Sequence, residues 1–244
     1  MSENPFQGKV AIVTGASRGI GEATARLLAE RGAAVTLVSR GRDPLNQVAD
    51  RINADRGRRA ALAVCGDVGS EATWKDAFQA ASEAFGAVDI LVNAAGLFRA
   101  GSLADTELDE WEEVLAANLR GSFLGCRAMF RQAGRLQRPG SIVNISSLGG
   151  IRSTEKFPGM AAYVVSKHGI VGLTEIAAVE GKTLGIRVNA VAPGAVATEM
   201  LRQAAPFLKT KTQPEDVAKA IAFLCDETQS GKVSGSVLEI FSNE

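Results

Sequence analysis

The sequence contains a single histidine, His168, and only three cysteines, and this scarcity limits the chemistry available to it. One histidine is too few for a histidine-rich metal site or for a catalytic triad built on an imidazole base. The cysteines, Cys65, Cys126 and Cys225, are odd in number, widely spaced and surrounded by apolar residues. We therefore expect buried free thiols rather than disulfide bonds or metal ligands.

An excess of charge of one sign is also missing, because 27 basic side chains balance 27 acidic ones. The sequence has no block of basic residues of the kind that binds nucleic acid or an anionic membrane surface. The longest apolar runs are too short to span a bilayer, and the first residues lack the features of a secretory signal. We expect a cytoplasmic protein whose residues 1–244, 46% of them hydrophobic, form one domain.

The sequence does contain a regular alternation of short apolar runs with longer amphipathic stretches. The apolar runs, which we expect to be strands, cover residues 10–13, 35–38, 60–64, 88–92, 141–145, 187–191 and 237–240. Strands separated by helix-length segments are typical of βαβ units with right-handed crossovers. We predict an α/β fold, a single doubly wound domain of the Rossmann type, with a seven-stranded parallel sheet and helices on both faces. Such sheets bind ligands beyond the carboxyl ends of their strands.

The first apolar run leads into a glycine-rich turn with the sequence Thr14-Gly15-Ala16-Ser17-Arg18-Gly19-Ile20-Gly21. Glycines remove side chains where the backbone must approach a ligand, and the helix that follows presents unpaired amides to an anion. A glycine trio can also form a simple tight turn. Its position after the first strand nevertheless favours a site for the pyrophosphate of a dinucleotide.

Tyr163 and Lys167 lie four residues apart, so that on a helix both side chains share one face. Tyrosine has a pKa of about 10, but a fixed positive charge nearby favours the phenolate and lowers that pKa. Such a tyrosine can pass a proton to the oxygen of a ketone. Taken alone, the pair can also be a surface contact.

Four motifs occur together in one order: the glycine turn, Asn93-Ala94-Ala95-Gly96, Tyr163-x-x-x-Lys167 and Pro193-Gly194. In this combination the chain resembles the short-chain dehydrogenase/reductase family over residues 8–239, and within it the carbonyl reductases of the 3-oxoacyl reductase type. The resemblance implies a nicotinamide dinucleotide as cofactor. It also implies a homotetramer packed through the helices around residues 118 and 163, for which the apolar segment 170–177 is suitable, although burial within one monomer would give the same pattern.

The resemblance assigns the chemistry to four side chains, Asn118, Ser147, Tyr163 and Lys167. Ser147 would bond the substrate oxygen, and Tyr163 would donate the proton while hydride leaves C4 of the nicotinamide. Lys167 would lower the pKa of Tyr163 and hold the ribose hydroxyls. Asn118 corresponds to the asparagine that holds a water molecule in the family's proton relay. Ser146 is the alternative candidate for the catalytic serine, but the family pattern favours Ser147.

The family's nucleotide-binding positions fall on the glycine turn and on the ends of the expected strands. They are Gly15, Ser17, Arg18, Gly19, Ile20, Gly21, Ser39, Arg40, Asp67, Val68, Asn93, Ala95, Gly96, Tyr163, Lys167, Pro193, Gly194, Val196 and Thr198. Of these, Asn93 has a structural role first. Asp67 would accept from the exocyclic amine of adenine, although a helix N-cap or a turn is nearly as good an interpretation.

The end of the second expected strand indicates which dinucleotide is bound. NAD enzymes place an acidic side chain there against the ribose 2′-hydroxyl. This chain has Ser39 followed by Arg40, with Arg18 in the glycine turn. Because arginine binds phosphate oxygens bidentately, two guanidinium groups beside a serine suit a 2′-phosphate, and we predict NADP(H). The alternative is that Arg40 is a solvated loop arginine.

Two segments depart from the family pattern around the substrate. The interval 148–162 is longer than usual and borders the substrate, whereas the lid segment 199–212 is short and suggests an open or less selective pocket. Arg138 occupies one of two basic positions that serve acyl-carrier-protein substrates in the family, but Leu184 occupies the other. A carrier-bound acyl chain is therefore in doubt, and a free ketone, an acyl thioester or a cyclic alcohol remains open.

The predicted function is the NADP(H)-dependent interconversion of a small carbonyl compound, 3-oxoacyl or similar, and a secondary alcohol. One alternative is an NAD-linked secondary alcohol dehydrogenase. The other is a nucleotide-binding regulatory module with little turnover, which has no physical need for all four of the side chains assigned to the chemistry.

Overall fold

The computed structural model describes residues 4–205 and 207–242, which are built around a seven-stranded sheet. The strands run in the order β3-β2-β1-β4-β5-β6-β7, and each pairs in parallel with its neighbours. The winding reverses between β1 and β4, which is where doubly wound sheets open a crevice for a ligand. The predicted fold class is therefore confirmed.

All seven predicted strands are present, with ends that differ from the expectation by no more than two residues. They are β1 Val10–Thr14, β2 Ala34–Ser39, β3 Ala61–Cys65, β4 Ile90–Asn93, β5 Gly140–Ile145, β6 Ile186–Pro193 and β7 Val237–Ile240. In the register, Ile12 of β1 lies between Thr36 of β2 and Leu91 of β4. The apolar runs predicted the strands well because buried parallel strands are continuously hydrophobic.

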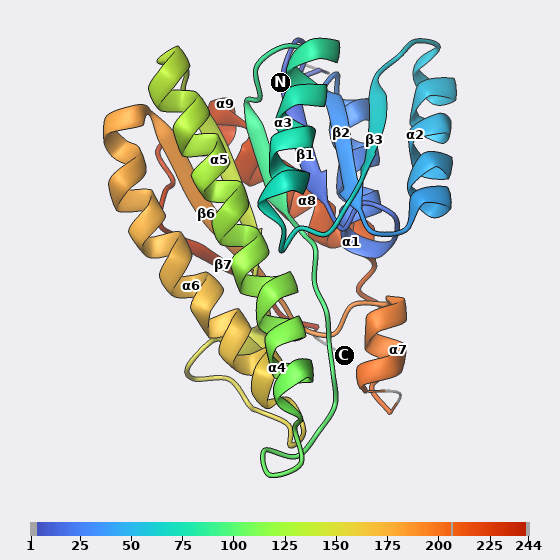
Figure 1. Ribbon diagram of the computed structural model, residues 1–244, viewed down its shortest axis with the longest axis vertical. Helices are drawn as coiled ribbons and strands as arrows, with labels where there is room; N and C mark the ends of the chain where they lie inside the picture. Colours follow the sequence, from blue (N-terminus) through green and yellow to red (C-terminus); the bar gives the residue numbers. More distant parts are fainter. Residues whose placement is uncertain (1–3, 206, 243–244) are drawn as a thin grey trace.

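Helices cover both faces of the sheet (Figure 1). The longer ones are α1 Gly19–Glu30, α2 Arg42–Arg56 and α8 Pro214–Cys225 on one face, with α3 Glu71–Ala84, α5 Gly121–Leu136 and α6 Ala161–Gly181 on the other. The short helices are α4 Leu108–Leu115, α7 Glu199–Ala204 and α9 Glu227–Ser230. A π-helical turn, Ala116–Arg120, joins α4 to α5, so that the two form one long bent rod.

The two faces have separate hydrophobic cores, as the alternation of side chains along a strand requires. On β1, Ala11 and Val13 point into the core shared with α1, α2 and α8. Val10 and Ile12 point into the core shared with α3, α5 and α6. The central strands are packed on both faces by these cores. Their carboxyl ends are therefore held in fixed positions along the same side of the sheet.

The cysteines have free thiols, as expected, but they are not all buried. Cys126 and Cys225 are buried, and burial raises the pKa of each thiol to about 12. Cys65 is exposed, so the expectation for this residue was wrong. It is the last residue of β3, the edge strand, and its thiol lies 3.1 Å from the carbonyl oxygen of Arg40. Apolar neighbours in the sequence do not bury a side chain at the end of an edge strand.

Helix α6 has both a buried and an exposed apolar face. Ile170 and Ala177 are buried inside the domain, whereas Ile176 and Val179 are more than half exposed. The segment 170–177 therefore owes only part of its apolar character to packing within the monomer. Within the part of the chain that the structure describes, no helix has the length and apolarity needed to cross a membrane.

Candidate active site

The glycine turn between β1 and α1 brings backbone close to backbone. Gly15 and Gly19 have φ angles of 64° and 59°, in the left-handed region that glycine adopts without strain. A Cβ atom on Gly15 would lie 2.8 Å from the carbonyl oxygen of Ala94, and one on Gly21 would lie 2.3 Å from that of Gly15. The turn thus presents bare backbone and the start of α1, an arrangement that fits the pyrophosphate of a dinucleotide.

Thr14 joins this turn to the end of β4. Its hydroxyl donates to the carbonyl oxygen of Val92 at 3.4 Å and accepts from the amide of Ala95 at 3.0 Å. The segment 94–96 is thereby fixed beside the glycine turn. These two segments flank the reversal point of the sheet.

A cavity of about 800 Å³ lies at this edge of the sheet. Its walls come from the glycine turn, from the segments that follow β4, β5 and β6, and from α6 and α7. The predicted positions that line it are Ile20, Gly96, Ser147, Tyr163, Lys167, Pro193, Gly194, Val196 and Thr198. The structure therefore brings together residues that lie far apart in the sequence.

Tyr163, the single tyrosine of the chain, stands in the first turn of α6 beside this cavity. Its ring meets that of Phe98 edge to face, with centroids 5.6 Å apart and an interplanar angle of 73°. Burial raises the pKa of the phenol, and a hydrogen bond with Ser147 offsets part of this effect. The expectation that the pKa is lowered was therefore wrong in direction, because loss of solvation outweighs the favourable contact.

Lys167 is almost completely buried, one helical turn after Tyr163. Its Nζ atom donates to the carbonyl oxygen of Ile145 at 2.7 Å and lies 5.6 Å from the centroid of the tyrosine ring. Burial lowers the pKa of this ammonium group to about 8. At neutral pH it is still mainly charged, and its position is fixed by the end of β5.

The two serines that follow β5 have different environments. The hydroxyl of Ser146 is buried and donates to the carbonyl oxygen of Lys167 at 2.9 Å, a bond internal to the fold. Ser147 caps a short 3₁₀ turn, accepting from the amide of Gly149 at 3.1 Å, and contacts the Tyr163 phenol. The geometry therefore favours Ser147 as the serine next to the reacting atoms.

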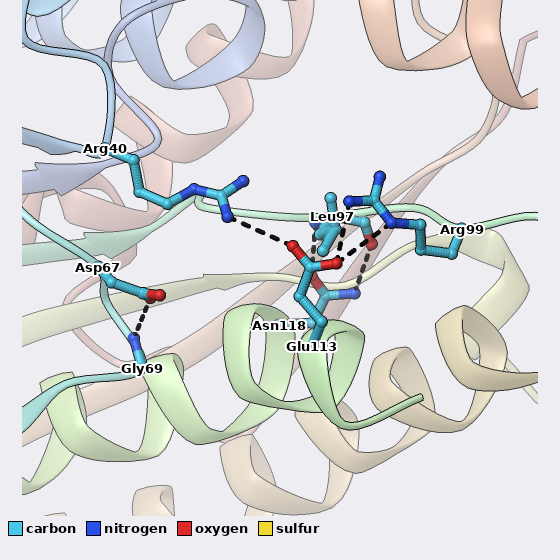
Figure 2. Close-up of polar contacts among 7 residues, drawn as sticks. All are labelled: Arg40, Asp67, Gly69, Leu97, Arg99, Glu113 and Asn118. Atoms are coloured by element: carbon cyan, nitrogen blue, oxygen red, sulfur yellow. Dashed lines mark hydrogen bonds and ion pairs between the residues drawn. The ribbon is translucent and has the colours of Figure 1, made fainter. Parts of the chain in front are cut away.

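Asn118 lies in the π-helical turn and is buried. Its Oδ1 atom accepts from the amide of Leu97 at 2.7 Å, and its Nδ2 atom donates to the Leu97 carbonyl at 3.0 Å (Figure 2). Nδ2 also donates to Ser166 Oγ at 2.9 Å, and that hydroxyl donates to the carbonyl of Tyr163 at 2.7 Å. The side chain thus ties the segment after β4 to the helix that carries Tyr163. A Cβ atom on Gly96 would lie 3.7 Å from Asn118 Oδ1 and 3.8 Å from Lys167 Nζ.

Asn93 does not line the cavity, although it stands at the end of β4. Its Nδ2 atom donates to Asn144 Oδ1 at 2.8 Å, and Asn144 in turn donates to Thr174 Oγ1 at 3.0 Å. This buried chain connects β4, β5 and α6. The structural role that the sequence suggested for Asn93 is the one found here.

The residues expected at the adenosine end lie at the ends of β2 and β3. Ser39 ends β2, and the guanidinium group of Arg40 beside it is largely exposed. Asp67 is exposed and accepts from the amide of Gly69 at 2.8 Å, as a turn residue (Figure 2). It is not a helix N-cap, because that position of α3 belongs to Ser70. The other carboxylate oxygen of Asp67 is not used in this turn.

Sequence reasoning missed Glu113, which lies 73 residues from Arg40 along the chain. Its carboxylate approaches Arg40 Nη1 at 3.5 Å, and it forms an ion pair with Arg99 at 2.9 Å (Figure 2). It also missed Phe98, which packs on the catalytic candidate Tyr163. No local pattern marks either residue, because both act through contacts made by distant segments.

The longer interval after Ser147 and the short lid meet at the mouth of the cavity. Phe157 and Phe207 form an edge-to-face pair with centroids 6.4 Å apart. Thr198 caps α7, accepting from the amide of Leu201 at 3.3 Å, and it lies beside the glycine turn. Residue 206 of the lid lies outside the described residues. The short lid thus still contacts the opposite wall.

Arg138 does not face this cavity. Its guanidinium group binds Asp89 Oδ1 through two nitrogens, at 2.9 and 2.7 Å, at the opposite ends of the strands. Asp89 is nearly buried and also accepts from the amide of Val10 at 2.9 Å. Arg138 is therefore part of a partly buried ion pair that joins the ends of β1, β4 and β5.

Known proteins resemble this chain over most of its length. The trans-4-hydroxycyclohexanecarboxylate dehydrogenase of Sinomonas cyclohexanicum is 41% identical over 79% of this chain and 74% of its own. A 3-oxoacyl-(acyl-carrier-protein) reductase of Vibrio cholerae is 35% identical over 96% of both chains. The crystal structure of levodione reductase superposes with a TM-score of 0.88 at 30% identity, covering 97% of both chains.

The sequence model of the short chain dehydrogenase family matches residues 9–209, which include the glycine turn, Ser147, Tyr163 and Lys167. Together with relatives that are more than 30% identical over nearly the whole chain, this match establishes the family. The chain belongs to the short-chain dehydrogenases, a family of oxidoreductases that use nicotinamide cofactors on carbonyl and alcohol substrates.

Proposed function

We propose that this protein is an NADP(H)-dependent oxidoreductase that interconverts a ketone and a secondary alcohol, with Tyr163 as the acid and base. One observation carries the proposal: Ser147, Tyr163 and Lys167 converge on a cavity beside a glycine turn that fits a dinucleotide. We further propose that the enzyme works in the cytoplasm as a homotetramer, without nucleic acid or membrane partners.

In the direction of reduction, bound NADPH would supply a hydride from C4 of its nicotinamide to the carbonyl carbon. Ser147 would donate a hydrogen bond to the substrate oxygen and orient it toward the phenol. Tyr163 would then give its proton to that oxygen, which completes the alcohol. Lys167, charged at neutral pH and fixed by Ile145, would stabilise the phenolate that remains and bind the ribose hydroxyls.

The surroundings of Asn118 support a positioning role in this mechanism. Both hydrogens of its amide are already donated, to Leu97 and to Ser166. Its oxygen accepts from the Leu97 amide and keeps a second lone pair for a water molecule. Asn118 would therefore hold both the segment after β4 and a relay water near Lys167.

The choice of NADP(H) is supported by Ser39 at the end of β2 and by the exposed Arg40 beside it. Neither Ser39 nor Arg40 is acidic, so the end of that strand itself offers no carboxylate to a ribose 2′-hydroxyl. A second candidate is an NAD-linked alcohol dehydrogenase. It is favoured by the closeness of Glu113 to Arg40, because this contact places a carboxylate near the end of β2. Replacing Arg40 separates the two candidates by its effect on coenzyme preference.

The cavity supports a ketone that is free rather than attached to a carrier protein. Its walls include the apolar side chains Phe98, Phe157, Met200 and Leu208. Arg138, which could have bound an acidic carrier, is held by Asp89, and Leu184 provides no charge. The name of the relative from Sinomonas describes a ring with a secondary hydroxyl, and a ring of that size suits a cavity with these apolar walls. A cyclic ketone or alcohol is therefore the substrate class that we favour.

The test is Tyr163→Phe, assayed with NADPH and a panel of cyclic and linear ketones. We expect the turnover number to fall by roughly 10²–10⁴-fold, the usual contribution of general acid catalysis. NADPH binding, followed by nucleotide fluorescence, should stay near the wild-type value because the cavity keeps its shape. A variant that retains the wild-type rate would show that another group delivers the proton. A wild-type protein that binds NADPH but reduces no ketone would favour the regulatory alternative.

A further inference from the structure

Glu113 lies between the segment that follows β2 and the segment that follows β4. It lies on α4 and faces two arginines from different segments, Arg40 after β2 and Arg99 after β4 (Figure 2). Its Oε1 atom lies 3.5 Å from Arg40 Nη1. Its Oε2 atom accepts from Arg99 Nε at 3.2 Å and from Arg99 Nη2 at 2.9 Å.

The two contacts are unequal in strength. The Arg99 contact is short and uses two nitrogens on one carboxylate oxygen, whereas the Arg40 contact is single and long. The three side chains are 37–60% exposed, so water can reach the junction and ligands can compete there. Glu113 is therefore anchored by Arg99 and reaches toward Arg40 with its remaining oxygen.

We propose that Glu113 sets the preference between NADPH and NADH by competing with the 2′-phosphate for Arg40, and that Arg99 limits this competition. The inference rests on the proposed function, in which Arg40 receives the 2′-phosphate. Glu113 is a positioning residue in this scheme, because it acts on the coenzyme through Arg40.

The competition follows from the chemistry of the guanidinium group. Carboxylate and phosphate both bind to its donors in the same planar geometry, so Arg40 cannot satisfy both fully. A carboxylate at this distance also repels a phosphate bound at Arg40, because both lie well within the Debye length of about 8 Å at physiological ionic strength. Both effects weaken NADPH binding, and neither acts on NADH, which has no 2′-phosphate.

Arg99 changes the strength of this competition in a predictable direction. While Arg99 holds Oε2, part of the carboxylate's charge is neutralised away from Arg40. Without Arg99, the carboxylate is free to pair with Arg40 alone. Removing Glu113 and removing Arg99 should therefore shift NADPH affinity in opposite directions, a pattern that a merely structural role does not produce.

The experiment measures the dissociation constants of NADPH and NADH by fluorescence titration of purified variants without substrate. We expect Glu113→Gln to tighten NADPH binding by about two- to fivefold, the range set by exposed ion pairs, with NADH unchanged. Arg99→Gln should weaken NADPH binding by a similar factor. Glu112→Gln is the matched control, because it removes an exposed carboxylate one position earlier on α4 and should leave both constants unchanged.

The ratio of the two constants is the decisive quantity, because a general disturbance of the site affects both coenzymes and cancels. The gain in NADPH affinity that we expect for Glu113→Gln should also become smaller at high salt, because salt screens exposed charges. If both variants shift the ratio in the same direction, or neither shifts it, the competition does not exist.

Arg40→Gln separates this inference from the proposed function. A lower preference for NADPH in Arg40→Gln, together with no change in Glu113→Gln, would overturn the inference about Glu113 and leave the coenzyme assignment intact. An unchanged preference in Arg40→Gln would overturn the coenzyme assignment, and the inference with it.

Discussion

The protonation state of Tyr163 decides in which direction the site works best. Burial raises the pKa of its phenol, so the group carries its proton throughout the neutral range. A protonated phenol is ready to donate to a ketone oxygen, which is what reduction requires. Oxidation of an alcohol needs the phenolate instead, and we therefore expect it to accelerate as the pH rises.

Because Tyr163 is the only tyrosine, its pKa can be measured directly from the ultraviolet absorbance of the phenolate. We expect the midpoint of the titration in the free enzyme to lie above the value of about 10 for unperturbed tyrosine. Tyr163→Phe provides the blank, since it leaves no phenol in the chain. Far-ultraviolet circular dichroism at each pH verifies that the fold persists. A midpoint below that of free tyrosine would mean that Lys167 dominates after all.

The glycine turn and the start of α1 form the element on which coenzyme binding depends most directly. A methyl group on Gly21 would lie 2.3 Å from the carbonyl oxygen of Gly15, a backbone atom that cannot move aside without opening the turn. We expect Gly21→Ala to lower the free energy of unfolding by about 1–3 kcal/mol, the usual cost of overpacking. It should also weaken NADPH binding, because the turn loses its shape. Chemical denaturation and fluorescence titration measure the two effects.

Gly134→Ala is the matched control for this substitution. Gly134 lies within α5, and a Cβ atom there would have no neighbour within 4 Å. Replacing a helical glycine by alanine in open space should stabilise the protein by about 0.4–1 kcal/mol without affecting coenzyme binding. If Gly21→Ala resembled this control in stability and in binding, the close approach at the turn would not matter.

The sequence was most informative where local patterns decide the structure. Buried parallel strands are continuous apolar runs, so every strand was found, and the fold then placed the motifs at the strand ends that line the cavity. It was uninformative where distant segments meet. Glu113 approaches Arg40 from 73 residues away, and Tyr163, which is half-buried, packs against Phe98 from a distant segment. The sign of the tyrosine pKa shift and the exposure of Cys65 are both consequences of tertiary position, which no spacing of residues encodes.

Helix α6 exposes a row of apolar side chains, and its neighbour α5 exposes two more, which concerns the assembly of the protein. The exposed apolar residues are Phe123 and Leu136 on α5, with Val165, Ile176 and Val179 on α6. The two helices lie side by side along one flank of the domain (Figure 1). Their inner faces already pack on the sheet, so the outer apolar residues need another surface to exclude water. A second copy of the chain would supply such a surface in the homotetramer that we propose.

We expect the purified protein to sediment as four chains of 25.5 kDa, and Val179→Asp to shift it toward smaller species. A charge introduced into an apolar contact must be desolvated without a partner, which costs more than such a contact contributes. The variant should keep its circular dichroism spectrum, since Val179 is exposed in the isolated chain. Leu103→Asp, at another exposed apolar residue outside these helices, should leave the assembly unchanged. Wild-type protein that sediments as a single chain would contradict the proposed assembly, and the apolar flank would then be an ordinary feature of its surface.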